Sequence, residues 1–437
     1  MLHRAAGRPL MDYALEAATG VTGSPPVLVI GRGAEAVRAA AGDRARCVVQ
    51  AEPLGTAHAV RQAEPLLRGQ CEAVLVTYGD MPLLRGDTLR ALARAQKLNT
   101  GPMTLVTVEA PHLPDFGRVV RDGFGKVRGV VEAVQASPAE RRITEVNVGA
   151  YCFSADWLWD TLPRLPLSPA GEYYLTDIVA LANQESGSVA SVSLSDATEA
   201  FGVDTRADLA QVEAVLRDRL NAYWMAEGVT LIDPATTYLE ASVTLGRDTC
   251  VWPNTHLQGR TAVGESCVLG PNTIIRDSTV GNGCRVECSV LEGAWLADEV
   301  SVGPFGHLRP GARLERGVHL GNFGEVKDST LGPGTKMGHF SYIGNATIGA
   351  EVNIGAGTIT CNFDGVKKNQ TIVEDGVFIG SDSMLVAPVR IGRDAKTGAG
   401  AVVTHDVPEA SLAVGVPARV TRKIQKAKQG GGGASNA

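Results

Sequence analysis

In the second half of the chain, aliphatic residues return at every sixth position. The longest runs extend from Leu245 to Ile275 and from Val302 to Val326, and the spacing resumes after short interruptions as far as Ile391. Glycine often follows the aliphatic residue. Neither an α-helix nor an alternating strand has this period, whereas a parallel β-helix of hexapeptide repeats does. We therefore expect each hexad to form one short strand, and three hexads, ~18 residues, to form one triangular coil.

The first 220 residues have a different pattern, in which apolar runs alternate with helical segments. We expect strands at 27–30, 73–77 and 104–108, and helices at 34–41 and 88–96. This alternation favours an α/β domain with a mainly parallel sheet and helices on its faces. Ligands of such sheets bind beyond the carboxyl ends of the strands.

These two patterns predict four regions along the chain. They are an α/β domain at 1–207, a linker helix at 208–228, a β-helix at 229–419, and a basic and then glycine-rich tail at 420–437. Apolar residues at helical spacing from Leu209 to Leu220 support the linker helix. Within the tail, we expect a short helix at 420–428 and disorder at 429–437.

Composition limits the class of partner. The formal net charge of −6 argues against a nucleic-acid partner. We find no apolar run long enough to span a bilayer and no leader at Met1, so we expect a cytoplasmic protein without membrane insertion. The eight cysteines contain no CxxC pair and are expected to be free thiols. Cys250, Cys267 and Cys284 stand 17 apart, and we expect them to stack on successive coils rather than to bind metal.

One carboxylate in the first half is a candidate metal ligand. Asp80 follows the expected strand 73–77, and Gly79 beside it would let a ligand approach closely. Such a carboxylate suits Mg²⁺ that also binds phosphate oxygens, although Asp80 could instead cap the following helix. Residues 31–36 match a loose GxGxxA dinucleotide fingerprint. Because such matches arise by chance, we favour a simple strand-to-helix turn over an NAD site.

In the second half, the segment Lys336–Gly344 carries candidate chemistry. The hexad phase places Met337 and Ile343 inside, which leaves His339 and Tyr342 free to face a groove between subunits. A neutral imidazole is well suited to take a proton from an amine, yet a lone histidine is more often a surface or core residue. Residues 361–370 interrupt the hexad count and must bulge as a loop.

Further motifs of the chain resemble the GlmU family of bifunctional N-acetylglucosamine-1-phosphate uridyltransferases and glucosamine-1-phosphate acetyltransferases. In the first half they are Gln50–Thr56, Phe116–Val119, Val131–Glu132, Asn147–Gly149, Glu172–Asp177 and Gly202–Arg206, and in the second half the GHxxYxG of Gly338–Gly344. The resemblance implies a Rossmann-like nucleotidyltransferase domain followed by a left-handed parallel β-helix. It also implies acetyl transfer from acetyl-CoA to glucosamine 1-phosphate, followed by uridylyl transfer from UTP to N-acetylglucosamine 1-phosphate.

For the first half, the resemblance implies Mg²⁺ held by Asp80 and Asp204. The family usually has Asn at the second position, and Asp is an equally hard oxygen ligand. The implied site for UTP and the sugar nucleotide comprises Gln50, Gly55, Thr56, Tyr78, Gly79, Asp80, Gly117, Glu132, Asn147 and Asp204. Gly117 and Gly149 could also be plain turn glycines.

The family opens with a strand, a glycine-rich loop and a lysine that cradle the triphosphate, ahead of a segment similar to 2–9. This chain begins within that segment. Either uridylyl transfer has been lost or the protein carries an upstream extension. We favour the extension, because the first strand of a doubly wound sheet usually lies mid-sheet, and its loss would bare two edges.

For the second half, the resemblance implies that His339 is the general base. Arg309, Lys327, Tyr342 and Asn353 would hold the sugar phosphate, and Asn362, Phe363, Ser381, Ala399 and Arg419 would bind acetyl-CoA. Phe363 replaces the family's common Tyr and so lacks its hydroxyl. The flat faces of a triangular coil favour a homotrimer with its sites in the clefts between subunits. Two alternatives are an acetyltransferase with an inactive first domain and a non-catalytic trimeric scaffold.

Overall fold

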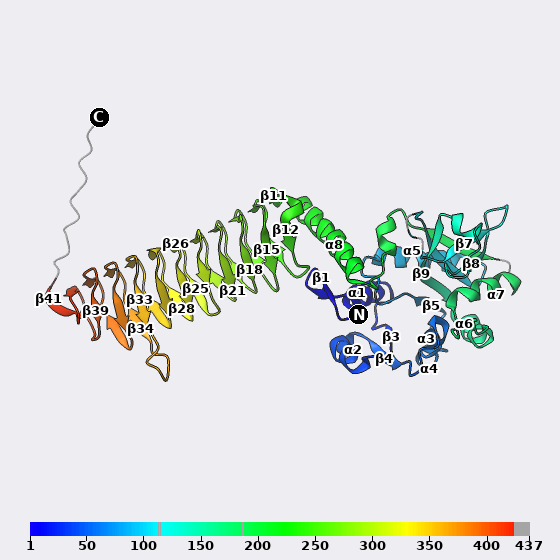
Figure 1. Cartoon of the computed structure of the whole chain (residues 1–437), viewed down its shortest axis with the longest axis horizontal. Helices are drawn as coiled ribbons and strands as arrows, with labels where there is room; N and C mark the ends of the chain where they lie inside the picture. Colours follow the sequence, from blue (N-terminus) through cyan, green and yellow to red (C-terminus); the bar gives the residue numbers. More distant parts are fainter. Residues whose placement is uncertain (112, 114, 186–187, 424–437) are drawn as a thin grey trace, which may run out of the picture. The chain divides into compact units, whose positions relative to one another are not determined.

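The computed structural model describes residues 1–111, 113, 115–185 and 188–423 (Figure 1). The chain forms two compact units, Met1–Leu216 and a second unit that begins at Arg217, and the boundary falls within helix α8 (Arg206–Ala226). Each unit has its own hydrophobic core. No described helix is both long enough and apolar enough to cross a membrane.

The first unit is built around a six-stranded mixed sheet with the strand order β10-β6-β9-β7-β8, in which β5 also pairs with β9. These strands are β5 (Ala73–Val76), β6 (Met103–Glu109), β7 (Arg118–Arg121), β8 (Val127–Val131), β9 (Glu145–Ser154) and β10 (Val189–Ser193). Two smaller sheets accompany it, the hairpin β1 (Arg4–Ala5) with β2 (Arg8–Pro9) and the parallel pair β3 (Val27–Ile30) with β4 (Arg46–Val49).

Helices cover both faces of the six-stranded sheet. Leu89 and Leu92 of α5 pack with Val106 and Val108 of β6 on one face, and α6 and α7 cover the other face. The helices of this unit are α1 (Leu10–Thr22), α2 (Ala34–Ala41), α3 (Thr56–Arg61), α4 (Glu64–Leu67), α5 (Gly86–Leu98), α6 (Ala155–Thr161) and α7 (Ile178–Glu185), with short 3₁₀ turns at Gly42–Arg44, Glu140–Arg142, Leu162–Arg164, Leu175–Asp177 and Ala197–Ala200.

The expected strands and helices of this unit are present as β3, α2, β5, α5 and β6, but the expected mainly parallel sheet is wrong. β9 runs antiparallel to β5, β6 and β7, and β7 runs antiparallel to β8. Among the described residues of this unit, the parallel pairs are β10–β6 within this sheet and β3–β4 outside it. β9 is covered on both faces, so its nearly continuous apolar sequence does not reveal its direction.

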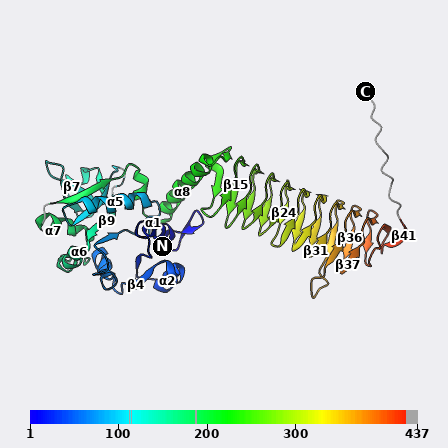
Figure 2. The ribbon, with the colours of Figure 1, turned by 180° about the vertical axis from the view of Figure 1, so that it is seen from behind.

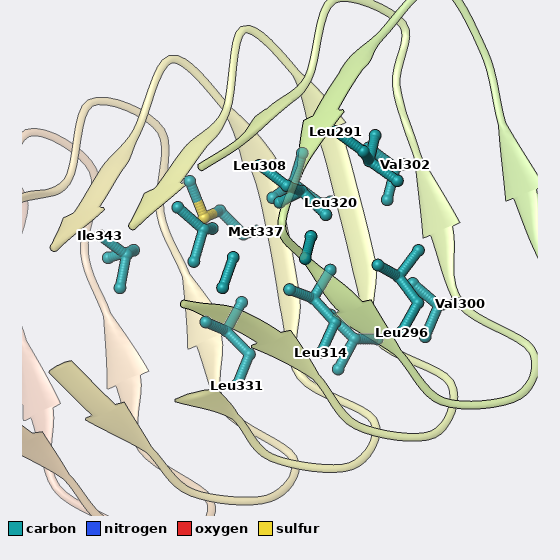
Figure 3. Close-up of a cluster of buried hydrophobic side chains, with 14 of the residues drawn as sticks. Leu291, Leu296, Val300, Val302, Leu308, Leu314, Leu320, Leu331, Met337 and Ile343 are labelled. Atoms are coloured by element: carbon teal, nitrogen blue, oxygen red, sulfur yellow. The ribbon is translucent and has the colours of Figure 1, made fainter. Parts of the chain in front are cut away.

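The second unit is a left-handed parallel β-helix (Figure 2). The hexads predict the parallel β-helix, and the family resemblance implies its left hand. Strands three apart in sequence pair in register, for example Val251 with Leu269 and Leu257 with Ile275. The aliphatic hexad positions therefore stack as columns inside the coil, where Leu308, Leu320 and Met337 are fully buried (Figure 3). A 3₁₀ turn at Pro234–Thr236 lies near its beginning.

Three sheets of 12, 10 and 9 described strands form the sides of the coil. The first contains β11 (Thr230–Leu231), β14 (Cys250–Val251), β17 (Val268–Leu269), β20 (Arg285–Val286), β23 (Ser301–Val302), β26 (His319–Asn322), β29 (Lys336–His339), β32 (Asn353–Ile354), β35 (Phe378–Ile379), β38 (Lys396–Thr397), β40 (Ser411–Val414) and β41 (Arg419–Lys423). The second contains β12 (Thr237–Leu239), β15 (Thr255–Gln258), β18 (Ile274–Arg276), β21 (Val290–Glu292), β24 (His307–Leu308), β27 (Glu325–Lys327), β30 (Tyr342–Gly344), β33 (Ile359–Cys361), β36 (Met384–Val386) and β39 (Val402–Val403). The third contains β13 (Thr244–Leu245), β16 (Ala262–Val263), β19 (Thr279–Val280), β22 (Trp295–Leu296), β25 (Ala312–Leu314), β28 (Ser329–Leu331), β31 (Ala346–Ile348), β34 (Thr371–Val373) and β37 (Val389–Ile391).

Glycine after the aliphatic position is required by the close approach of neighbouring coils. A Cβ atom added to Gly321 would lie 2.0 Å from the carbonyl oxygen of Gly338 on the next coil. A side chain at this position would therefore push two hydrogen-bonded strands apart.

Two details of the second unit differ from expectation. Val420–Lys423 belongs to strand β41, which pairs antiparallel with β40, and is not helical; the remainder of the expected tail lies outside the described residues. This exposed basic segment forms a strand because the edge of β40 is available for pairing, and its local composition does not predict that contact. Cys250 pairs with Val268, so Thr249 rather than Cys250 shares its stack with Cys267 and Cys284. All eight cysteines are free thiols.

Candidate functional sites

A cavity of about 890 Å³ in the first unit holds one half of the expected nucleotide site. Five of the expected residues line it, namely Gln50, Gly55, Thr56, Tyr78 and Gly79. These residues come from the segments that follow β4 and β5, which are the positions where ligands of such sheets are expected.

Local contacts fix the Gln50–Thr56 segment. The Gln50 side-chain amide donates to the carbonyl of Gly55 at 3.1 Å, and the Thr56 hydroxyl accepts from the backbone N–H of Leu175 at 3.0 Å. Gly55 has φ +99°, and a Cβ there would lie 2.6 Å from the carbonyl oxygen of Tyr173. Glycine is therefore required at this position by both conformation and space.

The two expected metal ligands come together. The backbone N–H of Val203 donates to the Asp80 carbonyl at 3.1 Å, which brings Asp204 beside Asp80. Burial raises the pKa of Asp80, and the Asp204 carboxylate raises it further. A divalent cation bound between the two carboxylates would offset this repulsion. Carboxylate oxygens are also the ligands that Mg²⁺ prefers. The residue chemistry therefore fits the ion.

The expected sugar residues form a second, adjoining cluster. The Asn147 backbone N–H donates to the Gly117 carbonyl at 2.8 Å, and the Asn147 side chain donates to the Tyr151 hydroxyl at 2.6 Å. A Cβ on Gly117 would lie 3.6 Å from a Glu132 carboxylate oxygen, so Gly117 borders this carboxylate. Glu132 in turn accepts from the Thr176 hydroxyl at 2.7 Å, a partner that the sequence reasoning did not assign.

Tyr78 links the two clusters. Burial raises its pKa to about 12, and the carboxylates of Glu132 and Asp80 contribute to the same shift. Its ring occupies the space beside Gly149, where an added Cβ would lie 2.3 Å from the Tyr78 Cε2 atom. Gly149 therefore does more than permit a turn, because a larger residue there would displace Tyr78.

In the β-helix, His339 lies at the end of β29 with an exposed side chain. Its ring nitrogen Nδ1 contacts the side-chain oxygen Oδ1 of Asn322, which occupies the paired position on β26. The alternative of a core histidine is thereby excluded. Asn322 was missed by sequence reasoning, although it stands 17 residues before His339, which is one coil.

A cationic cluster lies on the second sheet of the coil. Arg309 donates to Glu325 at 3.0 Å, and Glu325 pairs in register with Tyr342. Lys327, two residues further along β27, faces Lys368 of the 361–370 loop. Lys368 lowers the pKa of Lys327, with Arg309 adding to the effect. Asp328 Oδ2 lies 3.9 Å from Lys327 Nζ and opposes this shift without cancelling it, so the neighbouring cations favour an anionic ligand.

The loop at 361–370 bulges out between β33 and β34, as its break in the hexad count predicts. It is closed by a backbone bond of 2.7 Å from the Asn369 N–H to the Asn362 carbonyl. The buried Asn362 side chain donates to Asn345 Oδ1 at 2.7 Å, whereas Phe363 is 60% exposed. A hollow of about 350 Å³ at the base of the loop is lined by Asp328, Asn345, Lys368 and Gln370 among others.

The remaining expected residues lie along the coil toward its end. Asn353 is exposed on β32, paired with Lys336 of β29. Ser381 and Ala399 occupy corners on successive coils, joined by a backbone bond of 2.8 Å from the Gly400 N–H to the Ser381 carbonyl. Arg419 is exposed on β41. Arg309, Lys327, Tyr342 and Asn362 therefore form one group within a single chain, and Arg419 lies apart from it.

Comparison with known proteins covers both units. Residues 1–148 match the family model of the MobA-like NTP transferase domain, and residues 370–405 match that of the bacterial transferase hexapeptide. "Bifunctional protein GlmU" of Pelobacter propionicus is 45% identical over 97% of this chain and 93% of its own length. The proteins of that name from Heliobacterium modesticaldum and Carboxydothermus hydrogenoformans are 44% and 43% identical, over 95% and 97% of this chain and 91% and 95% of their own lengths.

The chain belongs to the GlmU family. The match extends over both units, so this chain carries the Rossmann-like nucleotidyltransferase fold together with the hexapeptide β-helix. Membership of a family of bifunctional proteins does not favour the non-catalytic scaffold or the acetyltransferase with an inactive first domain.

Proposed function

We propose that this chain catalyses two successive transfers in UDP-N-acetylglucosamine synthesis. The β-helix would transfer the acetyl group of acetyl-CoA to glucosamine 1-phosphate. The first unit would then join the phosphate of N-acetylglucosamine 1-phosphate to the α-phosphorus of UTP, which breaks the bond to the β-phosphate and releases pyrophosphate. The observation that carries this proposal is the arrangement on the β-helix, where an exposed imidazole held by an amide oxygen accompanies a cluster of cations.

Asn322 would set the tautomer of the proposed base. Its amide oxygen can only accept, so the proton of His339 would reside on Nδ1 and leave Nε2 with a free lone pair. Nε2 would take the proton from the amine of glucosamine 1-phosphate as the nitrogen attacks the thioester carbonyl. The C–N bond forms, the C–S bond breaks, and the imidazolium returns its proton to the departing coenzyme A thiolate.

The cationic cluster would hold the sugar phosphate during this step. Arg309 offers a planar guanidinium, and Lys327 and Lys368 offer neighbouring ammonium groups, although Lys327 also lies 3.9 Å from Asp328. A phosphate dianion would relieve their mutual repulsion. Tyr342 and Asn353 would complete this subsite. Asn362, Phe363, Ser381, Ala399 and Arg419 would contact acetyl-CoA along the coil.

In the first unit, Asp80 and Asp204 would hold Mg²⁺. When bound, the ion would offset the negative charge of the phosphate oxygens. Gln50, Gly55 and Thr56 would bind the uracil base, since the Gln50 amide and the Thr56 hydroxyl offer both donors and acceptors. Gly117, Glu132 and Asn147 would orient the sugar. Tyr78 would stay protonated at neutral pH, as an ordinary tyrosine does, and its raised pKa of about 12 extends this to more alkaline solutions.

We propose a cytoplasmic homotrimer. Phe305, Phe323 and Phe340 stack as a ladder on the β-helix, with ring centroids 5.1 and 5.0 Å apart. They are 54%, 48% and 60% exposed in the single chain, and contact with neighbouring subunits would cover them. His339 adjoins Phe340, so the acetylation site would lie beside such a contact. UTP and acetyl-CoA are cytoplasmic metabolites, which supports the location.

A product assay with substrates omitted in turn tests the two transfers. The protein with glucosamine 1-phosphate, acetyl-CoA, UTP and Mg²⁺ should form UDP-N-acetylglucosamine. Without UTP, N-acetylglucosamine 1-phosphate should accumulate, and without acetyl-CoA neither product should appear. If no coenzyme A is released when both glucosamine 1-phosphate and acetyl-CoA are present, the acetyl transfer is contradicted and a scaffold is favoured.

A further inference from the structure

The imidazole of His58 lies between two glutamine amides beside the candidate nucleotide site. His58 belongs to helix α3, and it is not among the described residues that line the cavity of about 890 Å³. Its Nδ1 atom lies 3.0 Å from Nε2 of Gln50, and its Nε2 atom lies 3.1 Å from Nε2 of Gln62. Gln50 does line the cavity, so His58 can act on a ligand there through Gln50.

Backbone carbonyls identify the nitrogen of each glutamine amide. Gln50 Nε2 lies 3.1 Å from the carbonyl oxygen of Gly55, and Gln62 Nε2 lies 3.1 Å from the carbonyl oxygen of His58. A carbonyl oxygen only accepts, so the amide atom that faces it must be the NH₂ group and not the amide oxygen. Each NH₂ group has two hydrogens, and each therefore has its second hydrogen available for a ring nitrogen of His58.

A neutral imidazole can accept from only one of these two amides. One ring nitrogen accepts while the other carries a proton, so one NH₂ group would face an N–H unless its amide turned. If Nδ1 accepts, Gln50 keeps both of its contacts and Gln62 turns its oxygen toward the ring. If Nε2 accepts, Gln62 keeps both contacts and Gln50 turns. The two arrangements present opposite atoms of Gln50 to the cavity, Oε1 in the first and Nε2 in the second.

The surroundings of the two amides favour the first arrangement. The Gly55 carbonyl also accepts from the Ala59 N–H at 3.1 Å, and the Gly55 backbone is packed closely against Tyr173. Because this carbonyl is held in place, a Gln50 oxygen that replaced Nε2 would be repelled by it. Gln62 stands directly after the last residue of α3 and is half-buried, so water can replace the carbonyl contact that its amide gives up.

We propose that His58 is a positioning residue that sets the base specificity of the first unit, because Nδ1 accepts from Gln50 and leaves Gln50 Oε1 to face the nucleobase. This inference rests on the proposed binding of uracil beside Gln50, and it narrows the role of that amide to an acceptor. Uracil has an N–H at N3, which can donate to Oε1. Cytosine has a lone pair at N3, which Oε1 would repel.

The second acceptor is needed because one hydrogen bond would not fix the amide. Two acceptors on the NH₂ group, the Gly55 carbonyl and His58 Nδ1, hold the plane of the Gln50 amide. Without the imidazole, the second N–H of Gln50 loses its acceptor and can turn toward a ligand. Cytosine N3 accepts such an N–H. Loss of His58 should therefore weaken the binding of UTP and strengthen that of CTP, whereas a loss of packing would weaken both.

Equilibrium binding of UTP and of CTP, each with Mg²⁺, tests the inference by titration calorimetry at pH 8. The parent should bind UTP at least about tenfold more tightly than CTP, and His58→Leu should lower this ratio about tenfold. His58→Asn places an amide oxygen near the position of Nδ1 and should keep the parent's ratio. His58→Gln places its amide nearer the position of Nε2 and should lower the ratio as His58→Leu does. Circular dichroism checks that each variant is folded.

The binding ratios also separate this inference from the proposed uridylyl transfer. If the parent prefers UTP but releases no pyrophosphate from UTP and N-acetylglucosamine 1-phosphate, the transfer is contradicted, and the ratios of the variants still decide the role of His58. A parent that binds UTP and CTP equally would overturn the inference. So would an equal loss of affinity for both nucleotides in His58→Leu, or a ratio kept by His58→Gln and lost by His58→Asn.

Discussion

The two units assemble their candidate sites in different ways. In the β-helix, neighbouring site residues stand one coil apart, as Asn322 and His339 do, and as Asn345 and Asn362 do, each pair separated by 17 residues. In the first unit, Asp80 and Asp204 or Glu132 and Thr176 meet from segments far apart in the sequence. A periodic backbone therefore fixes one site through register, whereas packing of loops and helices fixes the other.

The largest effect on the loop-built site should come from Asp80→Asn. Loss of a carboxylate ligand should lower Mg²⁺-dependent uridylyl transfer about 100-fold or more, because the charge offset at the phosphates is lost. Pyrophosphate release measures this activity. Coenzyme A release should be unchanged, and a parallel loss there would contradict the separation of the two sites.

The same variant should be more stable than the parent without metal. Burial and Asp204 raise the folded-state pKa of Asp80. Above the pKa of an unfolded aspartate, the carboxyl is therefore ionised more readily in the unfolded chain, which lowers the free energy of unfolding. Asp80→Asn should therefore increase the free energy of unfolding at pH 7 in EDTA. The gain should shrink as the pH falls below the pKa of an unfolded aspartate, where Asp80 is protonated in both states. Urea unfolding at pH 7 and pH 3 measures the difference.

The periodic site should be most sensitive to the spacing of its coils. Gly321→Ala places a Cβ 2.0 Å from the Gly338 carbonyl oxygen and should destabilise the β-helix by about 1–3 kcal/mol. Gly338→Ala is the matched control, because an added Cβ there meets nothing within 4 Å. Thermal unfolding followed by circular dichroism measures both. Equal midpoints for the two variants would contradict the close approach of coils at Gly321.

Asn322→Leu should reduce acetyl transfer roughly tenfold or more, because the His339 ring would lose the acceptor that fixes its tautomer. Asn322→Asp should instead retain activity and shift the acidic limb of kcat to higher pH, since a carboxylate favours the charged imidazolium. Steady-state coenzyme A release between pH 5 and 9 measures both. A purely structural role of Asn322 would leave the pH profile of the Asp variant unchanged.

The smallest effect should come from Lys368→Met, which should raise KM for glucosamine 1-phosphate on the order of 3–10-fold with little change in kcat. Lys368 lowers the pKa of Lys327, so its removal should raise that pKa. Phosphate binding weakens as Lys327 loses its proton, and the alkaline limb of kcat/KM should therefore move to higher pH. Lys367→Met, in the same loop, is the control.

The sequence predicts more of the β-helix than of the first unit, and the difference comes from how far apart in sequence the contacting segments are. The hexads identify the β-helix, its interior columns and the loop at 361–370, because each strand's partner lies one coil away. They miss Asn322 and Asn345, which coil spacing from His339 and Asn362 would have found. The expected stack of three cysteines is wrong by one residue at Cys250, because the step between paired strands varies. Cys250 pairs with Val268, 18 residues on, whereas Val268 pairs with Arg285, 17 residues on.

In the first unit, strands and helices are predictable but their arrangement is not. β9 is buried on both faces, and its apolar run is compatible with either direction. Its pairing with β5, β6 and β7 depends on contacts between distant segments. β41 is a further case, because its basic residues carry no strand signal and the free edge of β40 determines its structure.

The role of His339 as general base is decided by the turnover of His339→Ala, measured for both transfers in one preparation. Coenzyme A release should fall at least about 100-fold, because His339 takes the amine proton, while pyrophosphate release from UTP and N-acetylglucosamine 1-phosphate should stay within about twofold. Undiminished coenzyme A release, with the same oligomeric state as the parent, would contradict it.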